Sequence, residues 1–152
     1  MRLIWIGKTK NEHLRALADE YLKRLARFTR YEVTELRESG NADARVALEE
    51  EGRRIREALR ACELMVLLDV EGQQQWSSTE LAAQLERWQL NGTKEVAYVV
   101  GGHLGVAPEI VKRANVRWSL SRLTLTHEMA RVLLVEQLYR AHTIMRGLPY
   151  QK

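Results

Sequence analysis

The chain has 152 residues, of which 45% are hydrophobic and 29% charged, and its net charge is +4. This size and composition predict one compact domain over residues 1–152 and exclude a disordered chain. No apolar run approaches the roughly 18 residues of a membrane span or resembles a leader, and the single Cys62 excludes an internal disulfide and a cysteine-based metal cluster, so we expect a cytoplasmic protein without membrane or metal partners.

The first half of the chain predicts two strands and two helices in alternation. A buried strand over Leu3–Ile6 precedes a helix whose apolar residues between Leu14 and Leu25 recur with the spacing of one helical stripe. The alternating segment Tyr31–Leu36 predicts the second strand. After it, Asp43 is expected to cap a charged helix that runs to about Arg60.

The second half continues the alternation with more apolar strands. Leu64–Leu68 and Val96–Val100 are continuous apolar runs, as in central parallel strands buried on both faces. Between them, Ser77 or Ser78 with Glu80 opens a helix over Leu81–Leu90. A short helix, a short strand and a long final helix are then expected over Glu109–Ala114, Val116–Leu120 and His127–Met145.

Such an alternation of strands and helices predicts an α/β fold with a mostly parallel sheet and helices on both faces. Folds of this kind bind ligands in the crevice beyond the carboxyl ends of their strands. We therefore expect the chemistry of this protein after Leu68, after Val100 and after Leu120.

A glycine-rich turn follows the strand that ends at Val100. Gly101, Gly102 and Gly105 permit close approach of the backbone to a ligand, whose flat or anionic part would rest against main-chain N–H groups. The spacing matches neither the dinucleotide-binding pattern nor a phosphate-binding P-loop. On these residues alone, a tight turn without a ligand explains the pattern equally well.

The segment from Ser119 to Arg131 leads from the last strand into the final helix. Small polar groups are dense between Ser121 and Thr126, and Thr126 is placed to cap the helix. His127 and Arg131 then lie one turn apart on one helix face. A simple strand, loop and cap is the alternative to a ligand site here.

The final helix is apolar on more than one side, which predicts that a second subunit covers part of it. Glu136 and Arg140 stand four residues apart, so an ordinary intrahelical ion pair is one explanation of both. Residues 101–152 carry 8 Lys or Arg against 3 Asp or Glu. This basic balance suits RNA phosphates, although many solvated surfaces share it.

The motif GGHLG, followed by SLSRLTLTHEMARVLLVEQLYRAHTIMRGLPYQK, resembles the ribosomal large-subunit pseudouridine N3-methyltransferases, the RlmH family of the SPOUT superfamily. The resemblance covers the whole chain but is most specific over residues 101–152. It implies a C-terminal trefoil knot that holds S-adenosylmethionine, a homodimer, and methylation of a pseudouridine at N3 in 23S ribosomal RNA on the assembled ribosome. Periodicity alone gives no sign of a knot.

Site residues follow from this resemblance together with the two loops. The implied methyl-donor contacts are Leu68, Gly101, Gly102, Gly105, Ser121, Arg122, Leu123, Thr124, Leu125 and Thr126. His127, Arg131 and Tyr150 are the catalytic candidates, with Arg131 and His127 facing the nucleotide, and no metal is implied. The candidates for holding the RNA are Arg140, Tyr150 and Lys152. The tail residues Tyr150 and Lys152 are expected to reach the site of the partner subunit. A structural role at the helix start for His127, and simple packing for Tyr150, are the alternatives.

Two positions depart from the family pattern. Thr126 stands where the family has proline, and Gln151 stands where it has histidine. Because glutamine does not titrate near neutral pH, a mechanism that uses that histidine as a base is doubtful in this chain. A ribosomal RNA-binding module without chemistry, and a SPOUT enzyme that acts on transfer RNA, are the rival functions.

Overall fold

A computed structural model of the chain describes residues 1–59 and 62–151. Its five strands form one sheet in the order β2-β1-β4-β3-β5, and every neighbouring pair is parallel. The strands are β1 (Arg2–Ile6), β2 (Glu32–Leu36), β3 (Leu64–Leu68), β4 (Val96–Val100) and β5 (Val116–Trp118). The order places β4 at the centre, between β1 and β3.

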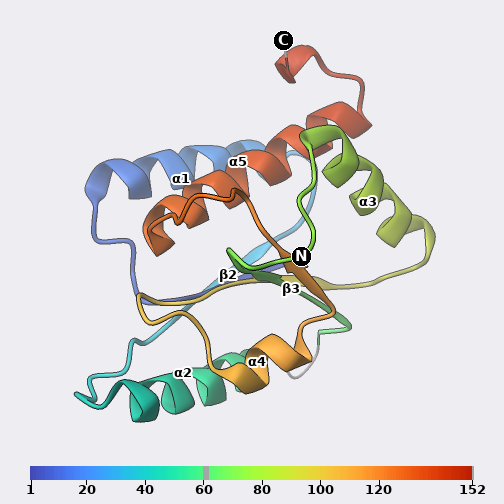
Figure 1. The fold of residues 1–152 in the computed structure, drawn as a ribbon. Coiled ribbons are helices and arrows are strands. Elements are labelled where there is room, and N and C mark those ends of the chain that lie inside the picture. Colours follow the sequence, from blue (N-terminus) through green and yellow to red (C-terminus); the bar gives the residue numbers. More distant parts are fainter. Residues whose placement is uncertain (60–61, 152) are drawn as a thin grey trace.

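Helices cover both faces of this sheet (Figure 1). One face carries α1 (Glu12–Leu25), α3 (Ser78–Leu90) and α5 (His127–Met145), and the other carries α2 (Ala44–Ala58) and α4 (Pro108–Arg113). Each layer has its own apolar cluster against the sheet, so β1, β3 and β4 are buried from both sides. The α/β fold predicted from the sequence is confirmed, while the knot and the dimer stay predictions. None of the described helices is long and apolar enough to span a membrane.

The expected capping residues begin three of the helices. The Asp43 carboxylate accepts the amides of Arg45 and Val46 at the start of α2, and Ser77 forms a reciprocal capping box with Glu80 at the start of α3. The hydroxyl of Thr126 accepts the amide of Met129 at the start of α5. These contacts satisfy N–H groups that a helix start leaves without partners, which explains why these boundaries follow from local sequence.

Some element ends differ from the expectation. Strand β5 stops at Trp118 instead of Leu120. Its last contact with the β3 side is the hydrogen bond from Asp69 N–H to Trp118 O, and the next amide, Ser119 N–H, donates to Gln74 O. Helix α4 starts one residue early, at Pro108, which suits the first turn of a helix. The expected helix end near Arg60 lies outside the described residues, and α2 ends at Ala58.

Candidate active site

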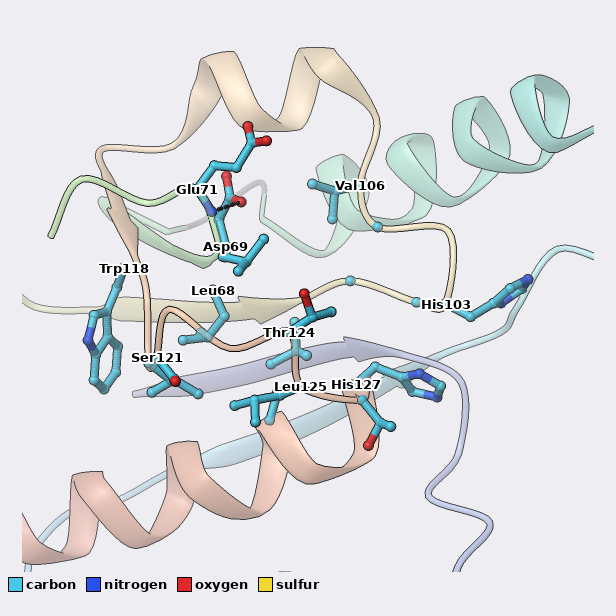
Figure 2. A pocket seen from close by; sticks show the side chains of 18 of the residues that line it. Leu68, Asp69, Glu71, His103, Val106, Trp118, Ser121, Thr124, Leu125 and His127 are labelled. Carbon is cyan, nitrogen blue, oxygen red and sulfur yellow. Dashed lines mark hydrogen bonds between the residues drawn. The ribbon is translucent and has the colours of Figure 1, made fainter. Parts of the chain in front are cut away.

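A cavity of about 930 Å³ opens at the carboxyl ends of β3, β4 and β5. Three segments build its walls, the 68–71 turn after β3, the 100–106 turn after β4 and the loop that joins β5 to α5 (Figure 2). The lining is mainly apolar, through Leu68, Val106, Trp118 and Leu125, with His127 at its edge. The cavity therefore lies at the three strand ends where the sequence directs attention.

The glycine turn leaves no room for a side chain on Gly101 and little room for one on Gly102. A Cβ on Gly101 would stand 2.6 Å from Gly105 O, and one on Gly102 would stand 3.1 Å from Ile6 Cγ2. Gly105 has a φ of +82°, and its amide closes the turn by donating to Gly102 O at 3.0 Å. All three glycines line the cavity, so the turn presents bare backbone to it.

The loop between β5 and α5 is shaped by its own hydroxyl groups. Ser119 Oγ donates to Ser121 O at 2.8 Å, and Ser121 Oγ accepts the amide of Leu123 at 3.0 Å. Ser121, Leu123, Thr124, Leu125 and Thr126 line the cavity. Arg122, expected beside them, is exposed and is not part of the lining. The two serines thus fix the shape of the loop through hydrogen bonds to its own backbone.

An ion pair on the opposite wall was not foreseen from the sequence. Asp69 accepts a hydrogen bond from Arg117 Nε at 2.8 Å, and Arg117 Nη2 forms an ion pair with the same carboxylate oxygen at 2.6 Å. Both residues line the cavity with Glu71. Asp69 follows the apolar strand directly, and Arg117 lies on the neighbouring strand β5. The position of Asp69 directly after a buried strand is the one sequence feature that could have indicated a polar group at the site.

His127 is the first residue of α5 and lies at the edge of the cavity (Figure 2). Burial of the half-buried imidazole lowers its pKa below the ordinary value of 6.5, and the positive charge of Arg131 lowers this pKa further. Glu128 opposes that effect in part. A pKa below 6.5 means that His127 is mostly neutral at pH 7, so one ring nitrogen is free to accept a proton.

Arg131 was expected to face a bound nucleotide, but the structure turns it inward. Its side chain is fully buried, does not line the cavity, and donates to Ile6 O and, at 3.0 Å, to Thr9 Oγ1. The guanidinium also lies 5.5 Å from the centre of the Trp5 ring. The end of β1 lies against this turn of α5, which draws the side chain away from the cavity.

Glu128 acts on the same segment from outside. Its two carboxylate oxygens accept the amides of Lys10 and Asn11, at 2.9 and 3.1 Å. Arg131 and Glu128 together therefore fasten the turn between β1 and α1 to the first turns of α5, next to His127.

A family model described as "Predicted SPOUT methyltransferase" matches residues 1–151. The chain belongs to the SPOUT methyltransferase family. Proteins named ribosomal RNA large subunit methyltransferase H from Desulfotalea psychrophila and Gloeobacter violaceus are 41% and 42% identical to this SPOUT chain over 150 residues. Each alignment covers 99% of this chain and 97% of the relative, which confirms the resemblance drawn from residues 101–152.

A solved structure shares the SPOUT architecture at much lower identity. It is titled as a probable methylase family protein from Haemophilus influenzae, and it matches with a TM-score of 0.61 at 13% identity, over 99% of this chain and 70% of that one. At this identity the likeness shows the fold alone.

In this SPOUT chain, the tail candidates lie far from the cavity. Arg140 pairs with Glu136 at 2.8 Å, as the intrahelical alternative predicted, and its guanidinium lies 4.7 Å from the centre of the Tyr150 ring. The Tyr150 hydroxyl donates to Glu136 at 3.1 Å, and its ring packs edge-on against Tyr139. Thirteen residues at the helical rise separate Arg140 from His127 by about 20 Å. Neither tail residue lines the cavity, and Lys152 lies outside the described residues.

Proposed function

We propose that this SPOUT chain transfers the methyl group of S-adenosylmethionine to N3 of a pseudouridine in large-subunit ribosomal RNA. The observation that carries the proposal is the cavity at the ends of β3, β4 and β5, walled by the glycine turn and the 120–126 loop. The names of the relatives support the substrate class, since they act on large-subunit ribosomal RNA by name. The choice of N3 and of pseudouridine rests on the resemblance of residues 101–152.

The residues of the cavity suit this donor. About 930 Å³ falls within the range of roughly 300–1,000 Å³ that is usual for cofactor pockets. The bare backbone at Gly101 and Gly102 provides hydrogen-bonding groups for adenine, while Leu68, Val106 and Leu125 provide apolar contacts for its faces. When bound, the donor supplies an electrophilic methyl group on a sulfonium centre. Leu68, the glycine turn and residues 121–126 would hold it there.

His127 is our candidate for accepting the proton that the acceptor must lose. The N3 imide of a pseudouridine carries a hydrogen, and methylation at N3 requires that this hydrogen leaves. A neutral imidazole at the edge of the cavity is suited to take it, because a general base must be unprotonated and close to the proton. The rest of the rate enhancement would come from holding the imide in line with the methyl group.

The tail requires a second subunit if it takes part in the reaction. Arg140 and Tyr150 lie about 20 Å from the cavity of their own chain, but a homodimer packed through α5 would bring one subunit's tail to the other's cavity. Met129, Leu133 and Ile144 leave part of α5 apolar and incompletely buried, which supports such packing. The RNA would then be held by the dimer, in the cytoplasm where ribosomes are assembled.

Calorimetric titration with S-adenosylmethionine tests the donor half of the proposal. We expect saturable binding at one site per chain, whereas an RNA-binding module without chemistry would release no heat. Mass mapping of ribosomal RNA from cells that lack the protein tests the acceptor half. Loss of one methyl group from a large-subunit pseudouridine is expected. Unchanged ribosomal RNA with a methyl group missing from transfer RNA would refute the assigned substrate.

Incubation of the purified enzyme with intact ribosomes and with free large-subunit RNA separates two further possibilities. Because the single sheet and its helices in residues 1–151 offer a limited surface for RNA, we expect methyl transfer to intact ribosomes and little to free RNA. Equal transfer to both would show that the isolated RNA contains everything the enzyme recognises.

A further inference from the structure

Glu51 of α2 carries a buried carboxylate that forms no ion pair with the residues that the structure describes. Glu51 is only 3% exposed. One carboxylate oxygen, Oε1, accepts a hydrogen bond from the amide of Ser39 at 2.9 Å. The other oxygen, Oε2, is buried and has no hydrogen-bond partner among residues 1–59 and 62–151. No ion pair to Glu51 occurs within those residues either. Burying an unpaired carboxylate oxygen is costly, so the position of this group calls for a reason beyond packing.

The unpaired oxygen lies against the glycine turn of the cavity. Glu51 Oε2 is 3.3 Å from the place where a Cβ on Gly102 would stand, and Gly102 lines the cavity. The next residue, Gly52, explains how α2 comes so close. A Cβ on Gly52 would stand 2.9 Å from Ala107 Cβ, so the missing side chain lets α2 approach the segment that follows the glycine turn. This approach carries the Glu51 carboxylate to the back of the turn.

Glu51 thereby connects two segments that are far apart in sequence. Oε1 holds Ser39, in the segment that follows β2, and Oε2 faces Gly102, in the turn that follows β4. The neighbouring Glu50 also holds Ser39, by accepting its hydroxyl at 2.7 Å, but Glu50 is partly exposed and pairs with Arg54. Only Glu51 of these two carboxylates reaches the glycine turn.

We propose that Glu51 is a positioning residue for the methyl donor, and that its Oε2 accepts a backbone N–H of the glycine turn when the turn closes on the donor. With Oε1 tied to Ser39, the carboxylate fixes the turn from behind while the donor rests on its front. The cost of the unpaired oxygen is then offset in the bound state, which favours that state. This inference rests on the proposed function, because it assumes that the cavity binds the donor.

The variants Glu51→Gln and Glu50→Gln form a matched pair for testing this role. Both replace one carboxylate by an amide of the same shape in neighbouring positions that hold Ser39. In Glu51→Gln, the oxygen can still hold Ser39, but an NH2 group then faces the turn. We expect the dissociation constant for S-adenosylmethionine to rise about tenfold, the scale of one lost hydrogen bond to a charged group. Glu50→Gln should bind the donor as the unmodified protein does.

Thermal unfolding separates positioning from simple stabilisation. Replacing a buried charged carboxylate by a neutral amide should leave the melting temperature of Glu51→Gln unchanged or raise it, although donor binding weakens. A lower melting temperature with unchanged donor affinity would overturn the inference alone. Absence of donor binding by the unmodified protein would overturn the proposed function, and this inference with it.

Amide exchange of the unmodified protein gives a test that needs no variant. Addition of S-adenosylhomocysteine, followed by NMR, should slow exchange in residues 101–105 and at Ser39 together, since one carboxylate would connect both. Slower exchange in the glycine turn with no change at Ser39 would contradict the proposed connection.

Discussion

Replacement of Arg131 by methionine tests whether this residue holds the fold of the site or contacts the RNA. Methionine has a similar length and no charge. In the structure it would remove the donors to Ile6 O and Thr9 Oγ1 and the guanidinium beside Trp5. The turn between β1 and α1 would keep the contacts of its Lys10 and Asn11 amides with Glu128. We therefore expect loss of stability together with loss of activity.

The size of the effect follows from the two acceptors left behind. A buried acceptor without a partner costs about 1–3 kcal/mol, and two of them cost about 2–6 kcal/mol. Part of this is offset, because the variant also removes a buried charge whose Nε has no partner within the described chain. A net loss of roughly 2–4 kcal/mol corresponds to a fall of about 4–16 °C in melting temperature for a domain of this size.

Thermal unfolding of Arg131→Met should be compared with that of Arg87→Met, since Arg87 is an exposed arginine of α3 without an ion pair in the described structure. The control should unfold within about 0.5 kcal/mol of the unmodified protein. A normal melting temperature and normal donor binding, combined with abolished methyl transfer, would refute the structural role. Arg131 would then have to reach the RNA in the assembled enzyme.

Three further predictions concern pH and the glycine turn. If neutral His127 accepts the proton, methyl transfer should be constant near pH 7 and fall at acid pH, through a His127 pKa that lies below 6.5; a rate that shows no acid fall before the protein unfolds would exclude the role. Burial lowers the pKa of His142 to about 4, so its contribution to stability, about 3 kcal/mol, is complete above pH 6.5 and is lost as the pH falls toward 4; His142→Phe should flatten this dependence in urea unfolding, whereas exposed His13→Gln should not. Gly101→Ala should weaken donor binding more than tenfold, because its Cβ would stand 2.6 Å from Gly105 O, while Gly40→Ala, which has nothing within 4 Å, should bind normally; equal affinities in titration would contradict the role of the turn.

The sequence predicts the bounds of those strands and helices whose ends are determined by neighbouring residues in the sequence. The bounds of β3, β4 and α5 agree with the expected Leu64–Leu68, Val96–Val100 and His127–Met145. Continuous apolar runs mark the two strands, and the hydroxyl of Thr126 marks the start of the helix. Strand β5 is shorter than expected because its end depends on the distant backbone of Gln74, which local patterns do not reveal.

Sequence patterns do not predict the direction in which a single side chain of the site points. Helical spacing places His127 and Arg131 on one face of α5, but that face is divided between the cavity and the end of β1. Glu51 gives a similar lesson. In the sequence, Glu51 is one of several acidic residues in a charged helix, and nothing there distinguishes it from its neighbours. In the structure, the close packing of Gly52 on Ala107 buries Glu51 at the glycine turn.

The position of the tail bears on which group removes the proton. Gln151 replaces the histidine that the family pattern has in the tail, and the tail lies about 20 Å from the cavity of its own chain. Even when a partner subunit brings the tail to the cavity, Gln151 has no proton-accepting group near neutral pH. The histidines that line the cavity are His103, which is exposed, and His127, which is half-buried with a lowered pKa. Burial of His127 favours its neutral form, and we therefore propose that the start of α5 accepts the proton while the tail holds the RNA.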